Sequence, residues 1–164
     1  MKLKYASWLP AVILMAVIYC FSNKPANDSN QTSLTIVDKI ITLCEDINNS
    51  PYAEEKKTEL SDQLNYIVRK TAHFCEYALL AILFALHLAI WKHRRKQLFW
   101  LPVALSCFYA MTDEFHQIFI PGRAGQLKDV LLDTSGAAVG AMFFLLLLRL
   151  FHHWRRKKRQ LTAS

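Results

Sequence analysis

The sequence predicts an all-α integral membrane protein, a bundle of four transmembrane helices with an outer helical loop, in one domain over residues 1–164. Three observations predict this class. Apolar residues make up 53% of the chain. They occur in long uninterrupted blocks and not at the spacing of soluble amphipathic helices. Basic residues gather before, between and after these blocks, as is typical of loops that border a membrane.

Four blocks are long and apolar enough to cross a hydrocarbon core of roughly 30 Å as helices. They cover residues 5–22, 72–91, 98–120 and 130–150. The first block follows Lys2 and Lys4, an arrangement that a cleaved signal peptide would share. No small-residue cleavage site follows it, and Tyr19 is too large for processing before Cys20. We therefore predict a signal anchor that stays as the first span.

Residues 23–68 form the predicted outer loop. Residues 23–31 are rich in turn-forming types, which indicates a turn-rich exit from the first span. Helical spacing of apolar residues then runs over 37–47, stops at residues 48–51, and resumes over 60–68 into the second span without a break. Such a helical pair would lie on lipid headgroups or cap the polar residues described below. A solvated hairpin is the alternative.

The basic residues predict the orientation. Twelve of the 20 Lys and Arg residues, and none of the 13 acidic residues, fall on one side of a four-span model. They are Lys2, Lys4, Lys92, Arg94, Arg95, Lys96, Arg149, Arg155, Arg156, Lys157, Lys158 and Arg159. Both termini are therefore predicted to be cytoplasmic, with residues 151–164 as a basic tail. The net charge of +7 then indicates contact with anionic membrane lipids and no binding of nucleic acid.

Polar residues interrupt the apolar blocks near one end of the second, third and fourth predicted spans. An ionisable group at membrane depth costs roughly 2.5 to 3.5 kcal/mol on insertion scales, so partners or a ligand must satisfy them. The four-span topology brings all of them to the outer leaflet, where we predict a ligand-binding site. The predicted binding residues are Arg69, Lys70, His73, Glu76, Tyr77, Asp113, Glu114, His116, Gln117, Arg123, Asp129 and Asp133.

Helical spacing places these residues on shared faces. Residues three and four apart lie on one side of a helix, so Asp129 and Asp133 share a face with Gly136 and Gly140. A Gly-x-x-x-Gly pair lets a neighbouring backbone approach closely. We therefore predict that this face packs into the bundle; ordinary membrane-helix composition is the alternative explanation of the glycines.

Several spaced motifs together resemble the VanZ-like family. They are Phe-Ser-Asn at residues 21–23, Arg69-Lys-x-x-His73-x-x-Glu76-Tyr77, Asp113-Glu114-x-His116-Gln117, Pro121-Gly122-Arg123, Asp129 and Gly136. The resemblance covers nearly the whole chain. It implies a small multi-span protein of the bacterial cell membrane, and an association with resistance to the glycopeptide antibiotic teicoplanin. It does not imply a mechanism.

Our preferred hypothesis is recognition of an anionic envelope molecule. Arg69, Lys70 and Arg123 suit phosphate or carboxylate, because Arg offers a bidentate fork and Lys a point charge. The partners would be membrane lipids, and a lipid-linked cell-wall precursor or a glycopeptide. No cofactor and no metal ion is predicted, and the oligomeric state is left open.

Other functions are compatible with the same residues. A hydrolase or transferase acting on a lipid-linked envelope substrate would use His73, Glu76, Asp113, Glu114 and His116 as catalytic candidates. A proton pathway would need titratable groups through the inner halves of the spans, where only His87 occurs. The last alternative is a structural bundle whose polar residues pair with one another.

Overall fold

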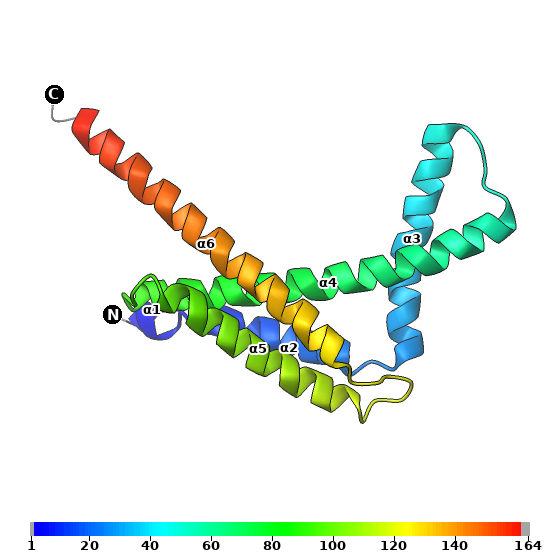
Figure 1. Ribbon diagram of the computed structural model, residues 1–164, viewed down its shortest axis with the longest axis horizontal. Helices are drawn as coiled ribbons and strands as arrows, with labels where there is room; N and C mark the ends of the chain where they lie inside the picture. Colours follow the sequence, from blue (N-terminus) through cyan, green and yellow to red (C-terminus); the bar gives the residue numbers. More distant parts are fainter. Residues whose placement is uncertain (1, 162–164) are drawn as a thin grey trace.

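The computed structural model describes residues 2–161, and within them the chain is all-α, with no strand. The predicted class is confirmed. The helices are α1 (Lys2–Tyr5), α2 (Leu9–Ser22), α3 (Ala26–Asn48), α4 (Glu54–Ile90), α5 (Gln97–Gln117) and α6 (Leu127–Leu161). Figure 1 shows α2, α4 and α5 running beside one another, α6 crossing them diagonally, and α3 crossing the first part of α4 at one side of the bundle.

Two helices in the described part of the chain, α4 and α6, are long and apolar enough to cross a membrane. A third candidate span arises if α2 and α3, which are bent by 105°, count as one. By itself α2 has 14 residues, about 21 Å of helix, which is short for a span. α5 has 21 residues, but Asp113, Glu114 and Gln117 make its last turn polar. Two to three candidate spans therefore stand, and the count of four stays a prediction.

The outer segment is helical over most of its length. The predicted turn-rich exit over 23–31 is wrong beyond residue 25, because Pro25 precedes the first turn of α3, where its fixed φ suits a helix start. α3 ends as predicted at Asn48, and Asn49 follows with a left-handed φ of 50°, a conformation that Asn tolerates. α4 then runs unbroken from Glu54 into the apolar block, as predicted.

Helices α2 and α4 run antiparallel, whereas α4 and α6 run in the same direction, with Gly136 against Phe74 and Gly140 against Ala78. The rings of Tyr5 and Trp91 lie 5.5 Å apart between centroids. Ser7 Oγ lies 2.9 Å from His87 Nδ1. The start of α2 is thus beside the end of α4. Basic residues of the α4–α5 connection and of α6 also meet there, around a cavity lined by Arg95, Arg149, His152, His153 and Arg156.

The glycine face of α6 is packed against α4, as predicted. A Cβ added at Gly136 would collide with the carbonyl oxygen of Phe74, and one at Gly140 with that of Ala78. The two backbones therefore approach more closely than any side chain would permit. Deeper in the same interface, Ala81, Ala137 and Ala141 form a buried cluster. α6 continues to Leu161, so the predicted basic tail is helical over its described part.

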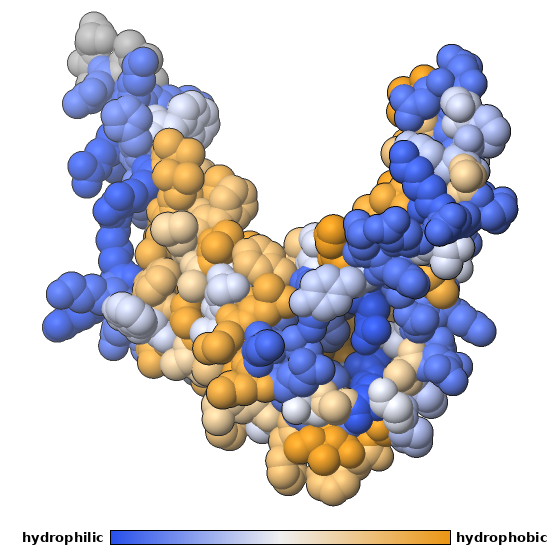
Figure 2. Space-filling model, turned by 45° about the vertical axis from the view of Figure 1, so that its right-hand side comes forward, coloured by the Kyte–Doolittle hydropathy of each residue, from blue (hydrophilic) through white to orange (hydrophobic). Residues whose placement is uncertain are grey.

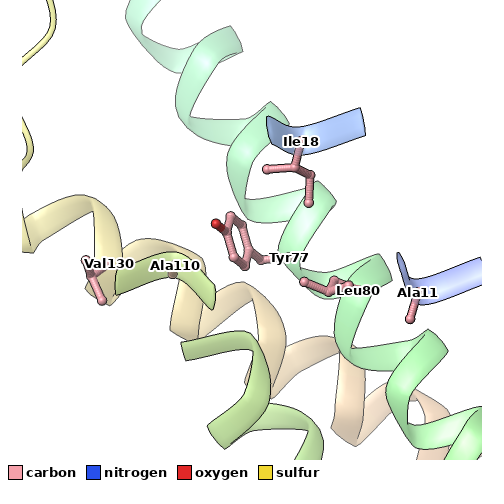
Figure 3. Packing of buried hydrophobic residues seen from close by; sticks show 6 residues of the cluster. All are labelled: Ala11, Ile18, Tyr77, Leu80, Ala110 and Val130. Carbon is pink, nitrogen blue, oxygen red and sulfur yellow. The ribbon is translucent and has the colours of Figure 1, made fainter. Parts of the chain in front are cut away.

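A second core cluster surrounds Tyr77 and positions the polar residues. Tyr77 is fully buried, between Ile18 of α2 and residues Ala110 and Val130 of α5 and α6 (Figure 3). Its ring centroid lies 6.1 Å from that of Tyr109. Four helices thus meet at one residue, directly beside the carboxylates described next.

Candidate functional site

A polar layer lies where the first turns of α6 meet the middle of α4 and the end of α5. Asp113, Glu114 and Gln117 of α5 are buried, and so is Asp133 of α6. Asp113 and Gln117 share the inner face of α5 with the buried Ala110, and Asp133 shares the inner face of α6 with the buried Ala137. Residues three and four apart lie on one side of a helix. The sequence prediction that three helices bring their polar stripes to one level agrees with this arrangement.

In the deepest part of this layer, several polar atoms have no hydrogen-bond partner among the described residues. Gln117 Nε2 donates to Asp113 Oδ2 at 3.2 Å. Asp113 Oδ1, both carboxylate oxygens of Asp133 and the Tyr77 hydroxyl have no hydrogen-bond partner among the described residues. Buried polar groups without partners are costly, so this part of the fold is held in place by the packing around it.

The outer part of the layer is better paired. Lys70 of α4 forms an ion pair with Asp129 in the first turn of α6. Glu114 Oε2 accepts a hydrogen bond of 2.8 Å from the backbone N–H of Gln126. The first contact ties the start of α6 to α4, and the second ties the α5–α6 connection to α5.

Arg123 lies in that connection and joins it to the end of α2 through hydrogen bonds. Its Nε donates to the carbonyl oxygen of Lys24 at 3.0 Å, and its Nη2 donates to that of Phe21 at 3.2 Å. The guanidinium thus satisfies carbonyl groups at the carboxyl end of α2, which helices leave unpaired. Burial lowers the pKa of Arg123 from its ordinary value, and the positive charge of Arg69 lowers this pKa further.

Arg69 differs from Arg123 and Lys70 in having no hydrogen-bond or ion-pair partner among the described residues. It is partly buried on α4, one turn before His73. His73 Nδ1 lies 3.9 Å from Glu76 Oε2, beyond hydrogen-bond distance. His73 and Glu76 therefore lie side by side on the same face of α4 without being locked together.

Two cavities meet at these residues. The polar cavity, of about 310 Å³, is lined by Ala26, Tyr66, Arg69, Lys70, His73, Gln117, Gly122, Arg123, Ala124, Gln126 and Asp129. The apolar cavity, of about 170 Å³, is lined by Ile18, Phe21, Ser22, Lys24, Ser29, Thr32, Ser33, Ile36, Val68, Arg69, Ala72, His73, Glu76 and Arg123. Arg69, His73 and Arg123 belong to both. Figure 2 shows hydrophilic residues gathered where the α3–α4 arm joins the apolar body.

The predicted binding residues thus separate into three groups. Arg69, Lys70, His73, Gln117, Arg123 and Asp129 line the polar cavity, and Glu76 lines the apolar one. Tyr77, Asp113, Glu114 and Asp133 lie behind the cavities in the buried layer. His116 turns to α2, where its ring stacks 4.9 Å from that of Tyr19 and its Nε2 lies 3.3 Å from Asn23 Oδ1.

Sequence reasoning missed the contribution of α3. Ser33 Oγ donates to Asn65 Oδ1, and Asn65 Nδ2 donates to Asn30 Oδ1, which joins α3 to α4 beside the apolar cavity. Ser29 and Ser33 lie one turn apart on α3, and Asn65 precedes Arg69 by one turn on α4. The signal was therefore present as helical spacing, but it lay inside a segment that we predicted to begin with turns.

The catalytic candidates are spread over different surroundings. Among the described residues, no group of three or more His, Cys, Asp or Glu side chains is arranged to hold a metal ion. His73 and Glu76 border a cavity, whereas Asp113 and Glu114 are buried and His116 faces α2. The geometry thus places one acid–base pair, of His73 and Glu76, at a cavity wall.

The fold and site define a small all-α multi-pass membrane protein with a polar, basic-rimmed cavity at one end of its bundle. A family model described as VanZ/LLP1 matches residues 7–149. The chain belongs to the VanZ/LLP1 family. No curated protein and no solved structure matches the chain.

Proposed function

We propose that this protein binds the anionic group of an envelope molecule in the polar cavity, and that this binding contributes to tolerance of teicoplanin-type glycopeptides. The bound molecule would be an anionic lipid, a lipid-linked wall precursor or a glycopeptide. The tolerance role is an expectation from the name and history of the VanZ-like family, whereas the binding role rests on the geometry of the cavity.

The observation that carries the proposal is the pair of guanidinium groups at the junction of the two cavities. Arg69 and Arg123 are close enough for the charge of one to act on the pKa of the other. Arg123 has two backbone acceptors, but Arg69 has no acceptor among the described residues. Two like charges at a partly buried site repel each other. The carboxylates of Asp113 and Glu114 raise the pKa of Arg123, but each acts on it less strongly than Arg69 does. A phosphate or carboxylate in the polar cavity would relieve this repulsion and accept the unused donors of Arg69.

The other charges of the cavity support a selective site. Lys70 is neutralised by Asp129, so the cavity does not act as a uniformly positive surface. Gln117, Gln126 and Tyr66 add groups that can hydrogen-bond to sugar or peptide. An anion with hydroxyl or amide groups next to it fits such a lining better than a simple ion.

Exchanging Arg69 for Lys tests the proposal. Arg69→Lys keeps the charge and loses the planar fork, so anion binding should weaken by roughly tenfold to a hundredfold, as expected for a lost charged hydrogen bond. The measurement is teicoplanin tolerance of cells that carry the variant, with membrane levels determined in parallel. Arg94→Lys, in the exposed α4–α5 connection, is the matched control. Full tolerance in Arg69→Lys cells would contradict the proposal.

We further propose that both termini are cytoplasmic, which makes the cavity outward-facing. The basic residues that gather at the opposite end of the bundle support this orientation. In a variant whose four native cysteines are replaced by alanine, a cysteine at Asn49 should react with a membrane-impermeant thiol reagent in intact cells. Cysteines at Gln97 and Gln160 should react only after the cells are broken. Labelling of Gln160→Cys in sealed cells would overturn the orientation.

One observation favours a second function, a hydrolase or transferase acting on a lipid-linked substrate. His73 and Glu76 lie side by side at the wall of the apolar cavity, and an imidazole next to a carboxylate can serve as general base and acid. Elemental analysis of the purified protein separates metal-dependent chemistry from simple binding. About one equivalent of zinc that is lost in His73→Ala would favour the enzyme.

A further inference from the structure

We propose that the apolar cavity holds an acyl chain of an anionic phospholipid whose headgroup phosphate lies in the polar cavity. This inference rests on the proposed function and narrows it to one class of ligand, an amphiphile taken directly from the bilayer.

The first support is the continuity of the two cavities. Arg69, His73 and Arg123 line both of them, so the cavities share a wall made by these side chains. The polar cavity is rimmed by basic groups. In the apolar cavity most of the exposed surface is carbon, although hydroxyl and charged groups also contribute to the lining. A ligand that spans both must carry an anionic group next to an apolar one, which is the chemistry of a phospholipid.

The second support is the wall of the apolar cavity. Ile18 of α2 is buried at its base, whereas Phe21 of α2 is 49% exposed and Ile36 of α3 is 47% exposed at its sides. Val68 and Ala72 of α4 complete the cavity. Because α3 bends away from α2 by 105°, apolar surface of three helices is left facing a common space. An alkyl chain entering from the bilayer would cover this surface.

The third support is size. With about 170 and 310 Å³, each cavity suits one chain segment or one phosphate-bearing headgroup. Even a drug-sized ligand needs a cavity of roughly 300 to 1,000 Å³, and a glycopeptide is larger. Arg69 at the shared wall would bind the phosphodiester, since its guanidinium offers paired donors to phosphate oxygens. Arg123, whose Nε and Nη2 donate to backbone carbonyls, would add positive charge. We therefore assign the apolar cavity to a lipid chain and not to a peptide antibiotic.

The test uses the purified full-length chain in detergent and three probes. Dihexanoyl phosphatidylglycerol carries the headgroup and chains, glycerophosphoglycerol carries the headgroup alone, and dihexanoyl phosphatidylcholine carries the same chains on a neutral headgroup. Binding is measured by titration calorimetry. Each buried methylene strengthens binding by roughly fourfold when it leaves water. We expect phosphatidylglycerol to bind at least about tenfold more tightly than glycerophosphoglycerol or phosphatidylcholine.

Variants locate the chain. Ala72→Phe fills the apolar cavity and should abolish the advantage of phosphatidylglycerol over glycerophosphoglycerol while leaving headgroup binding unchanged. Ile36→Asn changes the opposite wall, from α3, and should act in the same direction if Ala72→Phe does not fold. Thr71→Phe is the matched control, because Thr71 is exposed on α4 next to Ala72 and lines neither cavity. It should bind all three probes like the unaltered chain.

The outcomes separate the two proposals. If neither phosphatidylglycerol nor glycerophosphoglycerol binds, the phospholipid site is overturned, whereas the proposed function is overturned only by full tolerance in Arg69→Lys cells. If glycerophosphoglycerol binds and the chains add nothing, the acyl-chain site is overturned and headgroup recognition stands. The same holds if the advantage survives in both Ala72→Phe and Ile36→Asn. If phosphatidylcholine binds as tightly as phosphatidylglycerol, the anionic selectivity of the site is overturned.

Discussion

Both ends of the bundle carry ionisable groups, but these groups are exposed at the basic end and several of them are buried at the polar end. At the basic end, Arg95 and Arg156 are exposed on a connection and on the projecting part of α6. At the other end, Asp113 and Asp133 are buried between closely packed helices. Exposed charges cost little and can be repositioned, so the basic end is suited to setting topology. Buried carboxylates are expensive, so the packing around Asp113 and Asp133 must offset their cost.

The packing of α6 also differs between the two ends of the bundle. Its first half presents small residues to α4, with Gly136 and Gly140 against carbonyl oxygens of that helix. Its second half presents Leu150, Phe151 and Trp154 outward. The polar end is therefore rigid because backbones touch there, whereas the basic end projects from the bundle (Figure 1). A preorganised binding site needs the first kind of surroundings.

The largest effect is expected at the close contact that holds the polar end together. Gly140→Leu places a side chain where the carbonyl oxygen of Ala78 lies, so α6 must move away from α4. Overpacking of this kind costs about 3 kcal/mol or more. The variant should lose its monodisperse peak in size-exclusion chromatography after mild heating. Val139→Leu, at an exposed position next to it, should behave like the unaltered protein; a stable Gly140→Leu variant would show that the contact is dispensable.

The next effect concerns function and leaves the fold in place. Glu76→Gln and Asp113→Asn keep the shape and hydrogen-bonding capacity of the side chains and remove their charge. If the cavity wall at Glu76 and the buried layer at Asp113 serve ligand binding, each variant should lose teicoplanin tolerance at near-normal membrane levels. Arg95→Gln, which removes one charge at the basic end, should keep tolerance. If Glu76→Gln and Asp113→Asn instead disappear from the membrane, the layer is structural and the contrast between the two ends concerns stability alone.

Much of this arrangement could be predicted from the sequence, because helical periodicity and charge act locally. The spacing of Asp129, Asp133, Gly136 and Gly140 predicted the inner face of α6, since residues three and four apart share a side whatever surrounds them. The chain also turns at Pro25 and Asn49 for local reasons, and both turns lie in segments predicted to break a helix. The start of α3 directly after Pro25 was missed because its first residues are polar types that are common in turns.

Long-range contacts could not be predicted in the same way. Nothing in the local sequence shows that Arg123 donates to carbonyl groups of α2, about a hundred residues earlier in the chain, or that His116 turns to Asn23. The apolar cavity likewise depends on the 105° bend between α2 and α3, a tertiary feature. Motif spacing therefore predicted the residues of the polar end, whereas their division between cavity wall, buried layer and structural contact required the fold.

The smallest expected effect concerns the ion pair at the outer edge of the polar end, compared with the buried carboxylates behind it. The ion pair of Lys70 and Asp129 is about one quarter exposed, 25% and 24% by side chain, unlike the buried carboxylates behind it. Partly screened pairs contribute roughly 0.2 to 1 kcal/mol. In a double-mutant cycle of Lys70→Gln and Asp129→Asn, the coupling free energy of unfolding should stay below about 1 kcal/mol. Thermal unfolding of the four proteins in detergent measures it, with Lys39→Gln as the control for removing one exposed lysine. A coupling of about 3 kcal/mol would mean that the pair is as strongly desolvated as the buried layer, and that the outer rim of the cavity is closed.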